Sequence, residues 1–281
     1  MPESSFLERR PAPFLKWAGG KSRLIPQLAA FFPQKLPRGY LEPFAGGGAV
    51  FFHVRANLGA AHYTLIDNNE ELIHCYRTVR DETDALIERL GAHRALHSRA
   101  HYYQVRQQDP GLLDPVGRAA RFIYLNKTCY NGLYRVNSRG RFNVPIGAYP
   151  NPQIFDPENL KSVAGHLQGV ALETGDFEQV VSLAQEGDFV YFDPPYHPIS
   201  RTSKFTSYTP DAFSSYDQER LKRAVELLAA RGCLVMVSNS DCEFIRDLYR
   251  DFRIETVRAA RAINSDASRR GLINEVVVLN Y

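Results

Sequence analysis

Residues 40–48 read YLEPFAGGG, a short apolar run that ends in three glycines. Residues 49–58 then have the composition of a helix, and a second apolar run, 63–66, ends in Asp67. The order strand, glycine turn, helix and acid-tipped strand is typical of a β-α-β unit that binds a nucleotide at the carboxyl edge of a parallel sheet. Glycines such as Gly46 and Gly48 let backbone approach a ligand, although a plain tight turn needs the same residues.

The acid and the missing third glycine narrow the kind of nucleotide. A carboxylate at the position of Asp67 can accept paired hydrogen bonds from a ribose diol. Phe51 stands where the third glycine of a G-x-G-x-x-G fingerprint would be, so NAD binding is disfavoured.

Upstream, residues 15–22 (LKWAGGKS) are similar to a phosphate loop, but Leu15 takes the place of its first glycine. An ATPase site is therefore excluded. What remains is a Gly-Gly loop, from which Trp17 and Lys21 could contact a ligand that carries an aromatic base and a carboxylate. The alternative is that Lys21 is simply a lysine early in a helix.

The remaining apolar runs predict the fold class. Strands are expected at 170–172, 189–192 and 234–237, with a helix at 216–230 between the last two. Runs at 254–257 and 276–279 leave no room for a crossover helix and predict an antiparallel hairpin at the sheet edge. We therefore expect an α/β fold with a Rossmann-like, mostly parallel sheet.

The segment 69–155 breaks this alternation, because it is helical in pattern up to about residue 127 and then rich in Gly, Asn, Arg and Tyr. In a chain of 281 residues this favours one domain, 1–68 and 156–281, with a second domain inserted at 69–155.

Basic and aromatic side chains alternate in the second half of that insertion. Residues 116–155 contain no acid, and their six positive charges are Arg118, Arg121, Lys127, Arg135, Arg139 and Arg141. The interleaved aromatics are Tyr124, Tyr130, Tyr134, Phe142 and Tyr149. Such a surface neutralises phosphates and stacks on bases, although a solvated helix face above core aromatics would look the same.

Composition excludes several classes of protein. Hydrophobic residues make up 44% of the chain, no apolar run approaches the length of a membrane span, and residues 1–6 lack a signal-peptide layout. The four cysteines form no C-x-x-C pair, so neither a disulfide framework nor a zinc site is expected. We expect a cytoplasmic chain without metal or membrane partner, whose net charge of +3 permits nucleic acid.

Residues 193–196 read DPPY and follow the strand expected at 189–192. An adenine amine is a poor nucleophile because its lone pair is delocalised into the ring. The Asp193 carboxylate and the Pro194 carbonyl can accept its hydrogens, and Tyr196 can stack on the base. An Asp-Pro-Pro turn that merely closes a strand is the structural alternative.

Together, KWAGGK, EPFAGGG, Asp67, NKTCYNGLYRVN, FNVPIG and DPPY resemble, in this order, the Dam-type (D12 class) DNA adenine-N6 methyltransferases. The resemblance extends from about Phe14 to Tyr281. It implies S-adenosylmethionine as methyl donor, duplex DNA as substrate, base flipping, and a helical target-recognition domain with a β-hairpin. It also suggests GATC as the target, with no obligate protein partner.

The resemblance assigns roles to individual residues. The catalytic residues are Asp193, Pro194 and Tyr196. The cofactor-binding residues are Trp17, Lys21, Phe44, Gly46, Gly48, Asp67, Asp176, Phe177 and Asp193. The DNA-binding residues are Tyr130, Asn131, Leu133, Arg135, Arg139, Arg141, Pro145 and Tyr149. Arg135 is expected to make two bonds to guanine, Leu133 and Pro145 to press on thymine, and Arg139 and Arg141 to contact phosphate.

Two other functions stay open on the sequence. A methyltransferase acting on RNA or on a protein amide could carry the same tetrad, and so could a DNA-binding protein that retains an inactive methyltransferase fold. The expected reaction is direct transfer of the methyl group, without metal and without a covalent enzyme intermediate. Cys233 and Cys242 are then core or helix residues, because the Pro-Cys nucleophile of cytosine-C5 enzymes is absent from the sequence.

Overall fold

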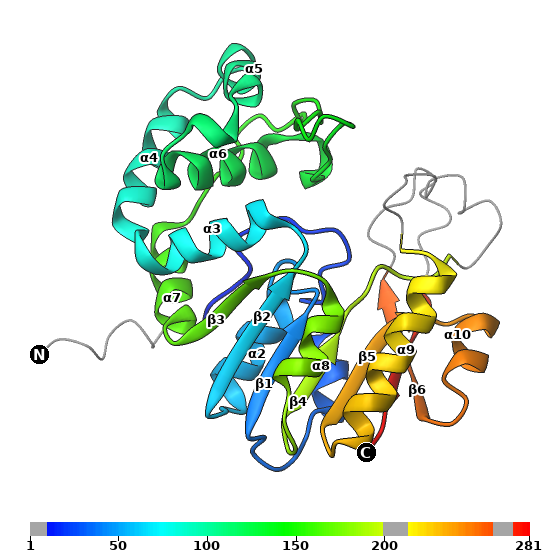
Figure 1. Cartoon of the computed structure of the whole chain (residues 1–281). Helices are drawn as coiled ribbons and strands as arrows, with labels where there is room; N and C mark the ends of the chain where they lie inside the picture. The colour runs from blue at the N-terminus through cyan, green and yellow to red at the C-terminus, as the bar shows by residue number, and fades with distance from the viewer. Residues whose placement is uncertain (1–9, 199–212, 261–271) are drawn as a thin grey trace, which may run out of the picture. The chain divides into compact units, whose positions relative to one another are not determined.

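The computed structural model describes residues 10–198, 213–260 and 272–281, so the expectation made for residues 1–6 lies outside it. Within these ranges seven strands form one sheet in the order β3-β2-β1-β4-β5-β7-β6 (Figure 1). The strands are β1 (Gly39–Pro43), β2 (His62–Asp67), β3 (Val170–Thr174), β4 (Phe189–Phe192), β5 (Leu234–Ser240), β6 (Arg253–Ala260) and β7 (Leu272–Leu279).

The helices follow the expected alternation and add four short 3₁₀ turns within the described residues. The α-helices are α1 (Ile25–Leu28), α2 (Ala49–Asn57), α3 (Glu70–Asp81), α4 (Thr83–Ala95), α5 (Arg99–Gln107), α6 (Pro115–Thr128), α7 (Pro157–Leu167), α8 (Val180–Leu183), α9 (Ser215–Ala230) and α10 (Glu243–Leu248). The 3₁₀ turns are η1 (Ala29–Phe31), η2 (Pro110–Leu112), η3 (Tyr130–Gly132) and η4 (Phe177–Gln179). In this part of the chain no helix is long and apolar enough to cross a membrane.

The pairing of the strands confirms the expected fold class. β1 pairs in parallel with β2 and β4, and β4 pairs in parallel with β5. β7 is antiparallel to both β5 and β6, which confirms the edge hairpin. The chain places β2 on one side of β1 and β4 on the other. The strand order therefore reverses between β1 and β4, where ligands bind in open α/β sheets.

The register brings the ends of the parallel strands level. Pro43 pairs with Ile66, and Phe192 pairs with Val237. Phe44, Asp67 and Asp193, which follow these strands or end them, therefore come to one edge of the sheet. β5 is longer than the sequence indicated, because it continues through Ser240.

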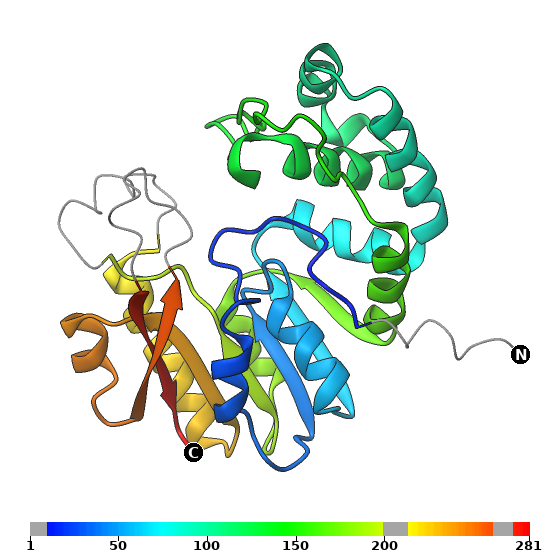
Figure 2. The ribbon, with the colours of Figure 1, turned by 180° about the vertical axis from the view of Figure 1, so that it is seen from behind.

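The chain divides into two compact units, and each is described by itself. One unit holds 1–20, 46–57 and 69–174, and the other holds 21–45, 58–68 and 175–281. In the second unit, helices α8, α9 and α10 share an apolar core with β1, β4, β5 and β7. Helix α1 lies against the opposite face of the sheet (Figure 2). There Phe32, which follows η1, packs on Phe189 of β4, with ring centroids 5.8 Å apart.

In the first unit, helix α6 is buried along nearly its whole length and packs against α3, α4 and α5. It begins at Pro115 after the cap residue Asp114, whose carboxylate accepts from the Gly117 N–H at 2.8 Å. The β-hairpin expected after α6 is reduced in the structure to single antiparallel bridges, Val136 with Phe142 and Cys129 with Ile146. The turn-forming residues that surround these bridges interrupt the alternation that a longer ladder would need.

Candidate active site

Asp193 begins the loop after β4, at the point where the strand order reverses. Its side chain is 19% exposed, and the Nζ of Lys21 lies 2.7 Å from its Oδ1, as an ion pair. Lys21 itself is only 5% exposed and precedes α1 by four residues. Lys21 also stands at the start of α1, where its carbonyl accepts from the Ile25 N–H at 3.1 Å, so its position early in a helix and its pairing with Asp193 both hold.

Burial raises the pKa of Asp193 above the usual aspartate value, and the charge and hydrogen bonding of Lys21 oppose that rise. Burial also raises the pKa of Glu275 on β7, and the charge of Asp193 raises it further. The hydrogen bond from the Tyr196 hydroxyl and the charge of Lys21 lower it. Both carboxyls thus hold protons more readily than exposed ones do, because the charged form is desolvated. Lys21 is the counter-charge that favours the ionised form of Asp193 and so opposes the effect of burial.

The Tyr196 side chain is held through both its hydroxyl and its ring. Its hydroxyl donates to Glu275 Oε2 at 2.7 Å, and Lys21 Nζ lies 4.7 Å from the centroid of its ring. A tyrosine held in this way presents its ring in one orientation, which a stacking surface for a base requires. The structure therefore brings together Asp193, Tyr196 and Lys21, three residues that the sequence analysis singled out.

Phe44 closes β1 in a conformation that is rare for a side-chain-bearing residue, with φ +81°. Its N–H donates to the Ile66 carbonyl of β2 at 2.9 Å, which holds the turn in place. Its ring stacks on that of Phe177, with centroids 5.3 Å apart, and meets Phe213 edge-on at 5.6 Å. Strained backbone of this kind is concentrated at functional sites.

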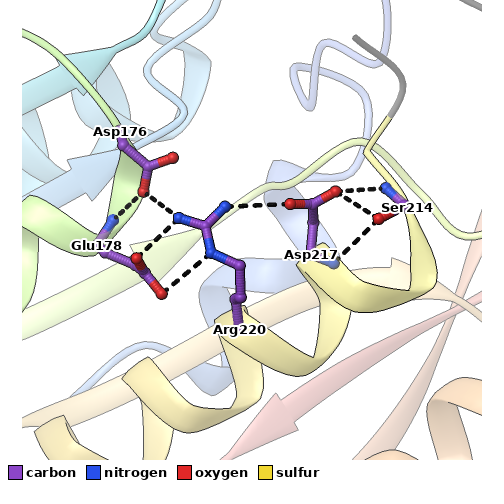
Figure 3. Close-up of polar contacts among 5 residues, drawn as sticks. All are labelled: Asp176, Glu178, Ser214, Asp217 and Arg220. Atoms are coloured by element: carbon purple, nitrogen blue, oxygen red, sulfur yellow. Dashed lines mark hydrogen bonds and ion pairs between the residues drawn. The ribbon is translucent and has the colours of Figure 1, made fainter. Parts of the chain in front are cut away.

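Asp67 and Asp176 come from adjacent strand ends, and the Gly175 N–H donates to the Asp67 carbonyl at 3.0 Å. The Asp176 carboxylate caps η4 by accepting from the Glu178 N–H. Arg220 of α9 reaches Asp176 at 3.1 Å, Glu178 at 2.7 Å and Asp217 at 3.1 Å (Figure 3). Its guanidinium also lies 5.0 Å from the centroid of the Phe177 ring, so one arginine ties α9 to the Asp176–Phe177 segment.

Gly46, Gly48 and Trp17 belong to the first unit. A Cβ at Gly46 would lie 2.9 Å from the Trp17 ring, and one at Gly48 would lie 2.6 Å from the Tyr76 hydroxyl. Both glycines have positive φ, and the Gly46 carbonyl accepts from Tyr76 at 3.0 Å. Glycine is thus needed here for conformation and for close packing of aromatic side chains, whether or not a ligand approaches.

The Trp17 ring also stacks on that of Tyr134, with ring centroids 6.2 Å apart.

The expected DNA-binding residues follow α6 in the first unit. Tyr130 is 53% exposed, and its N–H donates to the Pro145 carbonyl at 2.9 Å. Asn131, with φ +55°, and Gly132, with φ +65°, form the left-handed turn that leads to Leu133. Of the expected DNA-binding residues, those with exposed side chains are Tyr130, Asn131, Leu133, Arg135, Arg139, Arg141 and Pro145.

The side chains of two expected DNA-binding residues, Arg135 and Tyr149, contact other side chains of the protein. Asn143 orients the Arg135 guanidinium by accepting from its Nε at 2.7 Å. Tyr149 is partly buried and lies under Lys16, whose Nζ is 3.9 Å from the ring centroid.

The basic aromatic surface expected over 116–155 is smaller than its composition suggested. Arg121 is buried and donates to the carbonyls of Val105 and Arg106. Arg118 pairs with Glu70 and Glu71 of α3, and Lys127 is largely buried, which lowers its pKa to about 8. Tyr124 and Phe142 are core residues, as the structural alternative had it. The surface expectation was wrong for the α6 residues because α6 packs against other helices, and for Phe142 because its ring packs on that of Tyr134.

Sequence reasoning missed several residues around the DPPY loop. Gln218 of α9 and Asn239 of β5 are buried and hydrogen-bonded near it, and Glu275 holds Tyr196. A signal existed for two of them. Asn239 follows an apolar strand at its carboxyl end, and Glu275 interrupts an apolar one. Gln218 and Arg220 lie on a helix whose pattern does not distinguish them from surface residues.

The chain has remote likenesses among solved structures. A protein of Thermoplasma acidophilum of known structure has a TM-score of 0.40 and 13% identity, covering 92% of this chain and 86% of that one. A precorrin 8w decarboxylase from Methanobacterium thermoautotrophicum has a TM-score of 0.36 and 11% identity, covering 92% of this chain and 87% of that one. At these values neither likeness bears on function.

Comparison of sequences is informative. The type II methyltransferase M1.LlaDCHI of Lactococcus lactis subsp. cremoris is 44% identical over 96% of this chain and 95% of its own length. The type II methyltransferase M.MjaIII of Methanocaldococcus jannaschii is 44% identical over 96% of this chain and 99% of its own. The DNA adenine methylase of Escherichia coli K12 is 35% identical over 95% of this chain and 94% of its own.

A sequence profile also matches residues 17–263, which include the glycine turn, the DPPY loop and Lys21, the partner of Asp193. The profile and the relatives agree with the expectation drawn from the motifs: the chain belongs to the D12 class of N6 adenine-specific DNA methyltransferases.

Proposed function

We propose that this protein transfers a methyl group from S-adenosylmethionine to N6 of a flipped adenine in duplex DNA, within the sequence GATC. The observation that supports this most is the position of Asp193. It starts the loop after β4 where the strand order reverses, partly buried and paired with Lys21, and is followed by Pro194 and by the fixed ring of Tyr196.

The residues at the sheet edge fit S-adenosylmethionine. The stacked rings of Phe44 and Phe177 provide an apolar surface for adenine, with the Asp176 carboxylate next in sequence to Phe177 as an acceptor for its amine. Asp67 ends β2, where a ribose diol is held in this class of sheet. Lys21 carries a positive charge suited to the carboxylate of methionine, and we assign Trp17, Gly46 and Gly48 to the same ligand.

When bound, the cofactor supplies an electrophilic methyl group on a sulfonium sulfur. The Asp193 carboxylate and the Pro194 carbonyl accept the two N6 hydrogens, which directs the nitrogen lone pair away from the ring and toward the methyl carbon. The new N6–carbon bond forms as the sulfur–carbon bond breaks, and N6 then gives up one proton. The raised pKa of Asp193 suits this carboxylate to receive that proton.

Tyr196 stacks on the flipped adenine, and its bond to Glu275 keeps the ring in the stacking orientation before the base arrives. Preorganisation of this kind lowers the barrier, because no group needs to reorient during the transfer. Neither a metal nor a covalent enzyme intermediate takes part in this scheme.

The choice of GATC rests on relatives named DNA adenine methylase, at 35% identity, and on the side chains exposed after α6. Tyr130 enters the duplex beside the flipped base, with Asn131 next to it. Arg135 makes two bonds to guanine O6 and N7, and Leu133 and Pro145 contact thymine. Arg139 and Arg141 contact phosphate, and Tyr149 supports this surface beside Lys16.

A transfer assay tests the proposal. The protein is incubated with radiolabelled S-adenosylmethionine and, in parallel, with unmethylated duplex DNA, RNA and denatured protein. Label in DNA alone, recovered as N6-methyladenine and confined to GATC when modified bases are sequenced, is the expected result. Label in RNA or protein would assign the second activity considered above. DNA binding without any transfer would indicate an inactive methyltransferase fold.

A further inference from the structure

The DPPY loop is held by buried side chains from two other elements. Gln218 of α9 donates through Nε2 to the Pro195 carbonyl at 3.0 Å. Asn239 of β5 accepts at Oδ1 from the His197 N–H at 3.2 Å, and its Nδ2 donates to Gln218 Oε1 at 3.0 Å. Both amide side chains are 0% exposed. The Ser240 hydroxyl adds a bond to the His197 carbonyl at 2.7 Å.

The orientation of each amide is determined by its backbone partner. The Pro195 carbonyl can only accept, so Gln218 must present its NH₂ group there, and the His197 N–H can only donate, so Asn239 must present its oxygen. The remaining oxygen of Gln218 then meets the remaining NH₂ of Asn239, which is the bond observed. No other assignment of the two amides satisfies all three contacts.

We infer that Gln218 and Asn239 are positioning residues for methyl transfer, an inference that rests on the proposed function. The rings of Pro194 and Pro195 already fix φ at two positions of the loop, so the remaining freedom lies mainly in ψ. The Gln218 bond fixes the peptide before Tyr196, and the Asn239 bond fixes the peptide after it. Tyr196 is thereby held between two anchored peptides, and the Pro194 carbonyl, one residue earlier, keeps its direction.

The isosteric variant Gln218→Glu tests this inference. The carboxylate keeps an acceptor for Asn239 Nδ2 but sets an oxygen against the Pro195 carbonyl, so the loop loses one anchor while the packing volume is unchanged. The readouts are the single-turnover rate at saturating cofactor and GATC duplex, the affinity for S-adenosylhomocysteine by calorimetry, and the melting temperature. We expect the rate to fall roughly tenfold or more, since small misplacements of reacting groups have large costs, with the affinity changed less than about twofold.

The variant also carries a pH signature. A buried carboxyl has a raised pKa, and its protonated form can again donate to the Pro195 carbonyl. We therefore expect the ratio of the Gln218→Glu rate to the wild-type rate to increase as pH is lowered. A purely structural defect would leave this ratio constant or decrease it.

Asn159→Asp is the matched control. Asn159 is a buried amide of α7, in the other compact unit, that donates to the Ala12 carbonyl and accepts from the Ala12 N–H, both at 2.9 Å. The Asn159→Asp variant should lose a comparable hydrogen bond and show a comparable fall in melting temperature, while its single-turnover rate stays at the wild-type value. If Gln218→Glu does not fold, Ser240→Ala replaces it, and this change should still lower the rate with unchanged cofactor affinity.

A Gln218→Glu rate within about twofold of an active wild type would overturn the inference. So would a rate loss that is matched by an equal loss in cofactor affinity or shared by Asn159→Asp. If the wild type itself transfers no methyl group to DNA, the proposed function fails, and the positioning role fails with it.

Discussion

The Asp193 carboxylate is the group on which the transfer depends most directly. Replacing Asp193 with Ala should lower the transfer rate about a thousandfold or more, because one hydrogen acceptor for the N6 amine is lost from a partly buried site. DNA affinity should change little, since this carboxylate makes no contact with phosphate in the proposed scheme. Single-turnover kinetics and a duplex-binding titration measure the two effects. A variant that keeps a tenth of the wild-type rate would remove Asp193 from this role, and Asp251→Ala serves as an exposed carboxylate control.

Lys21 is expected to influence the pH below which activity is lost. Transfer needs the ionised form of Asp193, whose pKa is raised by burial and lowered by Lys21. Activity should therefore fall, as pH decreases, at a higher pH than for an exposed aspartate. Lys21→Met removes the charge that lowers the pKa of Asp193. The acid limb of the plot of kcat against pH, measured at saturating cofactor, should therefore move to still higher pH. Lys222, a partly exposed lysine that pairs with Glu226, gives the control variant Lys222→Met, and the acid limb of its kcat profile should stay where it is in the wild type. An unchanged limb in Lys21→Met would contradict the proposed pairing.

At the scale of elements, α9 supports two different segments of the site. Through Gln218 it holds the DPPY loop, and through Arg220 it holds the segment of Asp176 and Phe177. The capping box at its start, where Ser214 and Asp217 bond reciprocally, fixes the first turn of the helix that carries both side chains. Since Asp217 also pairs with Arg220, the helix cap and the arginine stabilise each other.

Arg220 is expected to affect cofactor binding rather than transfer. Arg220→Met leaves the carboxylates of Asp176 and Glu178 without their shared counter-charge and removes the cation over Phe177. The dissociation constant for S-adenosylhomocysteine should rise about three- to tenfold, a modest effect because the ion pairs are partly exposed, while kcat at saturation stays near wild type. Calorimetry at low and high salt measures this, and the difference between the proteins should shrink with salt. Arg223→Met, one turn away on the same helix, is the control. A fall in kcat at unchanged affinity would assign Arg220 to the transfer step instead.

The elements differ in how well the sequence predicted them. The strands β1, β2 and β4 were predicted closely, because apolar runs and the turn residues after them mark local structure. The edge hairpin was predicted in kind and place, but β6 and β7 are each eight residues long, longer than their apolar runs. The carboxyl end of β5 was predicted too short, because Ser238, Asn239 and Ser240 are polar yet buried, and their hydrogen-bond partners come from distant residues. Arg121 shows the opposite failure. A charged side chain that the sequence places on the surface is buried, because α6 packs against other helices and the carbonyls of Val105 and Arg106 accept from the Arg121 guanidinium.

The same reasoning applies to the candidate site. The DPPY motif and the glycine turn were recognisable as segments of sequence. Lys21 and Glu275 were not recognisable as partners of Asp193 and Tyr196, since 172 and 79 residues separate the paired positions in the chain and only the sheet brings them together. Contacts between distant residues cannot be inferred from the periodicity of one sequence.

At the scale of the whole molecule, the distribution of positive charge matters more than its total. The net charge is only +3, and Arg118 and Arg121 have internal partners, so the exposed basic side chains of segment 116–155 are Arg135, Arg139 and Arg141. DNA binding is then expected to depend on few phosphate contacts and to show a moderate salt dependence.

Arg135 and Arg141 should differ in what they contribute. Arg135→Ala should relax the first position of GATC, by the roughly 1 to 3 kcal/mol that a bidentate guanine contact provides. Arg141→Ala should weaken binding to all sequences alike and flatten the salt dependence. Methylation rates on GATC and on duplexes with a substituted first base, measured for both variants, separate the roles. If Arg135→Ala discriminates between these sites as the wild type does, Arg135 contacts phosphate as Arg141 does.

The position of β7 in the sheet has a consequence for biosynthesis. β7 lies between β5 and β6 and delivers Glu275 to Tyr196, although it is the last strand of the described chain to be translated. A nascent chain that has already exposed the DPPY loop therefore still lacks the strand that completes the sheet and orients the tyrosine. In the proposed scheme, DNA methylation is therefore expected only after this strand has been translated, and chains that end before it are expected to be inactive.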